Sequence, residues 1–102
     1  MAITQATLGT TSTTLYTSVG NTAITVISFC NTSAGPVVFD LHVVPNGGTL
    51  DGTNIIYKTV SVTATDTYII DTERYVLGNG DSIRALDDTG AVMVATVSYV
   101  SL

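Results

Sequence analysis

Two apolar runs separated by a short polar segment constrain the fold of this chain most strongly. The runs cover residues 23–30 and 37–44, and residues 31–36 lie between them. Both runs are rich in β-branched and aromatic residues, and the segment between them ends in Gly35-Pro36, a pair that interrupts regular structure. The pattern predicts two antiparallel strands joined as a β-hairpin.

Side chains at every second position of a strand point to the same face. In the second run apolar residues occupy one such face, whereas Asp40 and His42 interrupt the other. Pairing Phe29 with Phe39 in the hairpin brings the apolar sets of both runs to one side, and a slip of one residue would break this match. We therefore predict a core that includes Ile27, Phe29, Val37, Phe39, Leu41 and Val43.

Neither face of the first run is clearly polar. Ala23, Ile27 and Phe29 share one face, while Ile24 and Val26 share the other. A strand that is apolar on both faces is typical of the middle of a sheet that is covered on both sides. We expect residues 23–30 to form such a central strand.

The rest of the chain repeats short strand-like segments at intervals of about ten residues, with turn signals between them. Residues 1–12 are expected to form an edge strand or an N-terminal arm exchanged with a partner. No segment shows a helical pattern, and 102 residues suit one domain. The sequence predicts a single domain, residues 1–102. Its expected fold is an all-β antiparallel β-sandwich, Ig-like or jelly-roll-like, of seven to eight strands.

Charge is scarce and negative. Charged residues make up 11% of the chain, and the net charge is −5 with only three Lys and Arg residues. Such a chain lacks the basic stripe that binds a phosphate backbone, so we expect no nucleic-acid partner and no anionic membrane partner. Its 19 threonines favour strands and keep a surface polar without charge. A surface of this kind suits fixed neighbours in an assembly, and we expect a homo-oligomer.

Residues that usually carry chemistry are few. Cys30 is the only cysteine, which excludes an intrachain disulfide, and its expected role is that of a small buried apolar residue. His42 is the only histidine, and it is expected to be exposed or at an interface. The acids fall almost entirely in turns, where aspartate commonly binds its own backbone. We expect no catalytic residues, no metal site and no cofactor, and hence no enzyme.

The longest irregular segment, residues 45–54, contains three glycines and one proline, so we expect an exposed loop. Asn31-Thr32-Ser33 has the form of a glycosylation site, but turn formation by its side chains is the favoured interpretation. The N-terminus lacks the basic and hydrophobic regions of a signal peptide, which favours synthesis inside a cell without cleavage. Candidate interface or loop contacts are His42, Asn46, Asp51 and Asn54.

Several short segments occur in an order that resembles small structural proteins of tailed bacteriophages, in particular T4-like phages of marine cyanobacteria. The segments are Leu15-Tyr16-Thr17, Cys30-Asn-Thr-Ser33, the LHVVPNGGT segment (41–49), IIYK (55–58), DTYIIDTE (66–73) and GNGDSI (78–83). Each segment is ordinary turn or strand chemistry, and their joint order carries the resemblance.

The resemblance implies a β-sandwich component of the virion, made in the host cytoplasm and without enzymatic activity. Capsid decoration, neck, tail and fibre proteins all fit, with other virion proteins as partners. The main alternative is a module that binds carbohydrate or another host-surface group through residues 45–54 and nearby tyrosines.

Overall fold

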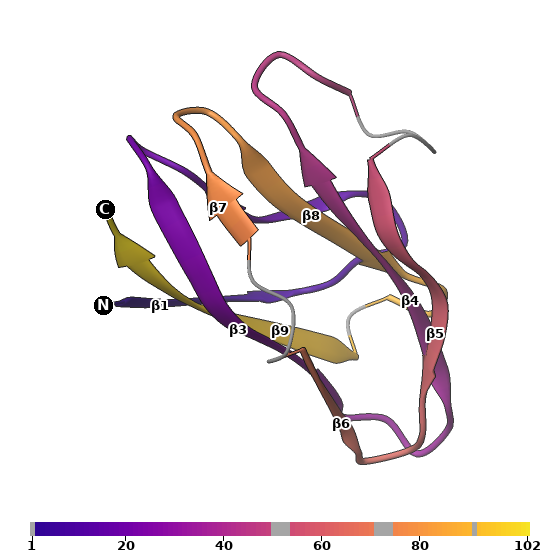
Figure 1. Ribbon diagram of the computed structural model, residues 1–102. Helices are drawn as coiled ribbons and strands as arrows, with labels where there is room; N and C mark the ends of the chain where they lie inside the picture. Colours follow the sequence, from indigo (N-terminus) through magenta and orange to yellow (C-terminus); the bar gives the residue numbers. More distant parts are fainter. Residues whose placement is uncertain (1, 50–53, 71–74, 91) are drawn as a thin grey trace.

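Figure 1 shows the computed structural model, which describes residues 2–49, 54–70, 75–90 and 92–102. Over these residues the chain forms nine β-strands and no helix, as the sequence predicts for an all-β protein. The strands are β1 (Ala2–Thr7), β2 (Thr13–Thr17), β3 (Thr22–Asn31), β4 (Val37–Val44), β5 (Ile55–Val62), β6 (Thr67–Ile70), β7 (Tyr75–Leu77), β8 (Ser82–Asp87) and β9 (Met93–Ser101). The described part contains no helix suited to crossing a membrane.

The strands form two antiparallel sheets packed face to face (Figure 1). The first sheet has the order β1-β9-β3-β6. β7 pairs with the same edge of β3 as β6 does, but at the start of β3, whereas β6 pairs with its end. The second sheet has the order β2-β8-β4-β5. The predicted antiparallel sandwich is therefore confirmed.

The pairing of strands is nested. β1 pairs with β9, β2 with β8, β3 with β6 and β7, and β4 with β5. The chain behaves as one long antiparallel ribbon folded at the β4–β5 connection and rolled up so that its successive pairs alternate between the two sheets. This arrangement is the jelly roll. The β6–β7 pair occupies the place of one interrupted strand, which accounts for a ninth strand beyond the seven to eight predicted.

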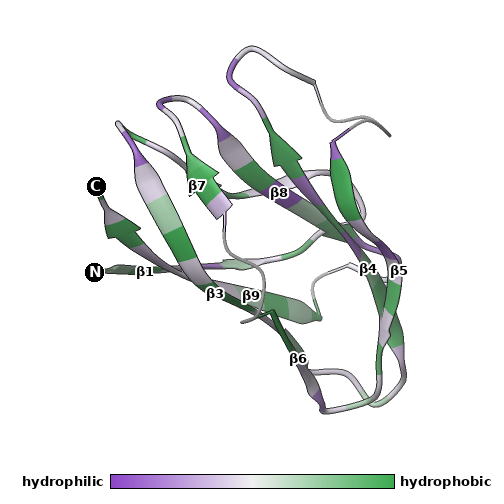
Figure 2. Cartoon of the chain, in the orientation of Figure 1, coloured by the Kyte–Doolittle hydropathy of each residue, from purple (hydrophilic) through white to green (hydrophobic). Residues whose placement is uncertain are grey.

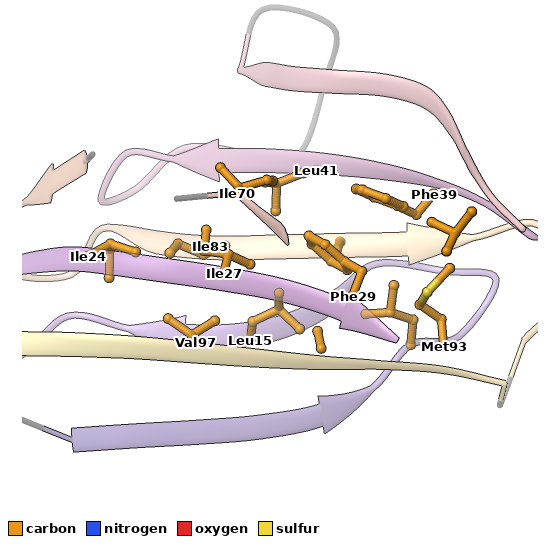
Figure 3. Packing of buried hydrophobic residues seen from close by; sticks show 14 of the residues in the cluster. Leu15, Ile24, Ile27, Phe29, Phe39, Leu41, Ile70, Ile83, Met93 and Val97 are labelled. Atoms are coloured by element: carbon orange, nitrogen blue, oxygen red, sulfur yellow. The ribbon is translucent and has the colours of Figure 1, made fainter. Parts of the chain in front are cut away.

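The predicted β3–β4 hairpin is wrong. β3 belongs to the first sheet and β4 to the second, and residues 32–36 carry the chain across the sandwich. Phe29 and Phe39 nevertheless meet: their rings stack from opposite sheets, with centroids 4.0 Å apart and planes 19° from parallel (Figure 3). Two strands that each have one apolar face can either pair within one sheet or pack against each other from opposite sheets. The local sequence is the same in both cases.

The core lies between the sheets (Figure 3). Of the residues named from the sequence, Ile27, Phe29, Val37, Phe39 and Leu41 are fully buried in it. Val43 is only partly buried, although it packs against the core at the end of β4. The odd face of β9 also points inward, with Met93, Ala95 and Val97 in the core.

A register shift in β3 changes which of its side chains reach the core. The pairing of β3 with β9 slips between Ile24 and Val26, as in a β-bulge. The extra residue lets Ile24 and Ile27, three positions apart, both point inward. Ala23 lies on the outer face instead, so the strict alternation expected for residues 23–30 holds only from Val26 onward.

β1 forms the edge of the first sheet, paired with β9 of the same chain along its whole length. This is the edge-strand form of the two arrangements expected for residues 1–12. β3 is central in its sheet, as expected, with β9 on one side and β6 and β7 on the other. Within the described chain, only its inner face is covered by another layer.

Candidate interaction surfaces

The outer face of the β1-β9-β3-β6/β7 sheet carries no charged side chain among the residues that the structure describes. Register and burial place on it only aliphatic, hydroxyl, amide and thiol side chains, because their neighbours along each strand point into the core. We call this surface the uncharged face. Its residues are Ile3, Gln5, Thr7, Ala23, Val26, Ser28, Cys30, Thr67, Ile69, Val76, Val94, Thr96, Ser98 and Val100.

Large apolar side chains stand out of this face towards solvent. Ile3, Ile69 and Val76 are 67%, 56% and 70% exposed. They come from three different strands, and hydroxyl-bearing residues of β9 and β3 lie between them. Edge strands usually carry a charge that discourages association, and here β1 and β6 present none on this side.

The opposite outer surface, on the β2-β8-β4-β5 sheet, is different. Arg84, Asp40 and Lys58 lie on it, and the Asp40 carboxylate accepts a hydrogen bond from the backbone N–H of Thr59 at 2.7 Å. Hydrophilic segments in Figure 2 accordingly occur in the loops and on parts of β8 and β4. The sandwich thus has one face with charges and one without them.

His42 lies on the outer side of β4, as its alternation predicts, but it is buried instead of exposed. Its cross-strand neighbour is Arg84. Its ring Nδ1 lies 2.8 Å from Oδ1 of Asn54. Because an amide oxygen only accepts, Nδ1 carries the proton and donates it. The start of the β4–β5 loop also covers Val44, which is fully buried beside Gly48 and outside the core cluster.

The other loop residues named from the sequence have structural partners. Asn54 donates from Nδ2 to the carbonyl of Thr49 at 2.7 Å, which fixes the orientation of its amide. The backbone N–H of Asn46 donates to Oδ1 of Asp81 at 2.8 Å. Asp51 lies outside the described residues. His42 and Asn54 therefore act together, and they hold the end of the β4–β5 loop against the sheet.

Three loops at one end of the sandwich are joined by hydrogen bonds. The backbone of Ser18 donates to Asp81 and accepts from Gly80, and Gly20 N–H donates to Oδ1 of Asn79. Oδ2 of Asp81 accepts from Gly78 N–H. Both oxygens of the Asp81 carboxylate are thus used inside the protein. This end of the molecule is a connected unit in which the β2–β3, β4–β5 and β7–β8 loops fix one another.

Gly80 is expected to tolerate alanine worse than Gly20 does. Both have positive φ, +87° and +71°, so each loses stability from backbone strain of about 1 kcal/mol. A Cβ on Gly80 would also lie 2.5 Å from Cγ of Asn46, whereas nothing lies near Gly20. Because the Asn46 side chain is exposed and can turn aside, chemical denaturation should show Gly80→Ala to be the more destabilising by about 0.5 kcal/mol. Adding Asn46→Ala should remove that excess; equal losses for both glycines would contradict the contact.

Asn31 forms the turn that its sequence context suggests, and it is fully buried. Its Nδ2 donates to the carbonyls of Gly35, Val62 and Thr63, and its Oδ1 accepts from the N–H and the hydroxyl of Ser33. The amide nitrogen that a glycan would modify is thus inside the folded protein. The local sequence predicts the turn, but the contacts with Val62 and Thr63 join Asn31 to the end of β5, and no local sequence signal predicts them.

Further polar groups complete the description. Cys30 was expected to be buried, but it is a free, half-buried thiol on the uncharged face. Asp87 is buried, with Oδ1 accepting from Thr89 and Gly90 N–H and Oδ2 without a partner among the described residues.

The described part contains no cluster of three metal-ligating side chains and no pocket. Comparison of the chain with protein-family models, curated proteins and solved structures finds no match.

Proposed function

We propose that this chain is a non-enzymatic structural component of a tailed-phage virion, a capsid decoration, neck, tail or fibre protein. It acts by self-assembly and by attachment to other virion proteins. The uncharged face is the observation that carries the proposal. A protein that spends its working life between fixed neighbours gains from a broad surface that can be buried without desolvating charge.

The rest of the structure suits a building block. Side chains bound to backbone groups help to fix both ends of the sandwich. The Asp81 carboxylate joins the β4–β5 and β7–β8 loops at one end, and Asn31 joins two strand ends at the other. Such loops keep the shape of the molecule constant during assembly. The jelly roll adds support at the level of the fold, since viral capsid proteins use it; lectins and cupins use it too.

The carbohydrate-binding alternative receives less support. A sugar site at the loop end would need polar side chains free to meet hydroxyl groups. The Asp81 carboxylate, the Asn54 amide and the Asn79 amide oxygen already bind partners within the protein. A glycan array that shows specific binders, lost on substitution of Asn46, would favour this alternative over assembly.

Purified phage particles provide the direct test. Mass spectrometry of particles from a phage that encodes this chain should detect it with a fixed number of copies per virion. A copy number in the hundreds would indicate capsid decoration, and a few copies would indicate a neck, tail or fibre position. Presence in infected cells together with absence from purified particles would overturn the proposed function.

A further inference from the structure

We propose that the uncharged face binds the same face of a second copy of this chain, sheet against sheet, around a twofold axis. The inference deepens the proposed function, and it rests on that function only for its biological setting, because the dimer is a property of the isolated chain. In a twofold contact one patch serves both partners. The patch therefore has to be complementary to itself, and a surface without charge meets this condition most easily.

The distribution of charge selects this face for contact between copies. Each copy has a net charge of −5, so two copies repel wherever their carboxylates approach. The described carboxylates lie on the outer side of β4, at the end of β8 and in the end loops, and none lies on the uncharged face. They are Asp40, Asp66, Asp81, Asp87 and Asp88. A contact through the uncharged face keeps the described charges of both copies away from the interface.

The chemistry of the face points to an uncharged occupant. A partner that brought a charged side chain onto the face would leave it desolvated and without a counterion, because the described face offers none. The same face of a second copy carries only exposed aliphatic side chains and uncharged polar groups among its described residues, and it therefore matches the first copy chemically. Ser28, Thr96 and Ser98 can each donate and accept, so the polar positions near its middle can pair across a twofold axis.

The face is large enough for a stable dimer. The sheet is four strand positions wide, and its long central strands β3 and β9 have 10 and 9 residues. The outer positions are shorter, with 6 residues in β1 and 4 and 3 in β6 and β7. At ~3.3 Å per residue and ~4.8 Å per strand, the described strands cover ~510 Å² on each copy. Two copies would bury ~1,000 Å², which reaches the ~1,000 Å² expected of a biological interface. Two sheets packed in this way lie ~10 Å apart with strands nearly aligned.

The sequence of β3 carries the same signal. Its outer positions include Ala23, Val26 and Cys30, where a solvated strand would show Lys, Glu or Asp. The sandwich covers only the inner side of this strand (Figure 1). A second sheet from another copy covers the outer side and turns β3 into the doubly covered strand that its composition indicates.

Sedimentation of the isolated wild-type chain across a wide range of concentrations tests the inference. We expect a reversible dimer that persists when salt is raised, since the described residues of the face contribute no ion pair that salt could screen. Ile69→Asp should raise the dissociation constant at least about a hundredfold, because each copy then carries a carboxylate into the interface. Labelling of the Cys30 thiol by a maleimide should slow as the dimer forms.

Val19→Asp is the matched control. Val19 is 83% exposed in the β2–β3 turn, outside the strands that form the uncharged face, and the substitution adds the same charge to the chain. It should leave the dimer intact. If Ile69→Asp does not fold by circular dichroism, Ile3→Asp on β1 tests the same face.

A wild-type chain that stays monomeric at every concentration would overturn the inference. The inference would also be overturned if Ile69→Asp and Ile3→Asp formed dimers with the same dissociation constant as Val19→Asp. A monomer in solution that is still present in purified particles would show that another virion protein occupies the face, and it would leave the proposed function standing. If the chain formed the dimer in solution but were absent from purified particles, the inference would stand and the proposed function would be overturned.

Discussion

Replacing Phe39 by alanine is expected to lower the free energy of unfolding by about 3–5 kcal/mol, the range typical for deleting a buried aromatic ring. The Phe39 ring is fully buried and stacks on Phe29 from the opposite sheet at 4.0 Å. It also lies 5.8 Å from the ring of Tyr68, so its loss leaves a cavity that three strands border. A small domain has about 5–15 kcal/mol of stability in total, and the variant should be close to unfolding.

Urea unfolding followed by far-ultraviolet circular dichroism measures the effect. Phe39→Leu, which keeps much of the volume, should lose clearly less than Phe39→Ala. Val19→Ala serves as the control, because its side chain is exposed and should contribute less than about 0.5 kcal/mol. A loss below about 1 kcal/mol for Phe39→Ala would contradict the contact between the sheets.

Replacing Asn31 by alanine is expected to cost about 2–4 kcal/mol, a large effect for one polar side chain. Its amide satisfies the carbonyls of Gly35, Val62 and Thr63 and holds the N–H of Ser33, in a fully buried position. Without it, several buried backbone groups lose their partners. Asn31→Asp should also be destabilising, because a carboxylate cannot donate to the three carbonyls and would repel them.

Asn79→Ala is the matched control for this position. Asn79 is exposed and accepts one hydrogen bond, from Gly20 N–H, so its loss should cost less than about 1 kcal/mol. Ser33→Ala should fall between the two, because it removes only part of the same network. Equal unfolding free energies for Asn31→Ala and Asn79→Ala would show that the buried network contributes nothing.

Local pattern was sufficient to predict the strands and most of the core, because alternation reports which side of a strand is covered. It was not sufficient to predict which strands pair. Phe29 and Phe39 carry the same signal in a hairpin and across a sandwich, and the choice depends on partners far along the chain. β3 finds β9, some seventy positions later in sequence, as its neighbour, and β4 finds β8.

The surface features divide in the same way. His42 was correctly placed on the side of β4 away from the core, but its burial depends on Asn54, which returns from the end of a long loop to cover it. The absence of charge on β1, β3 and β9 is visible in each strand separately. Its meaning appears only when the register brings these strands together into one surface.

The nested order of strands also governs when the uncharged face comes into existence during synthesis. Its middle strand β3 emerges from the ribosome before β9, which lies between β1 and β3 and is made after all the other described strands. A nascent chain therefore displays separated strands and cannot present the assembled patch to another nascent copy. Association through this face has to wait until β9 has folded between β1 and β3, and until then the unpaired edges of these strands are exposed to aggregation, as late long-range β-pairing generally is.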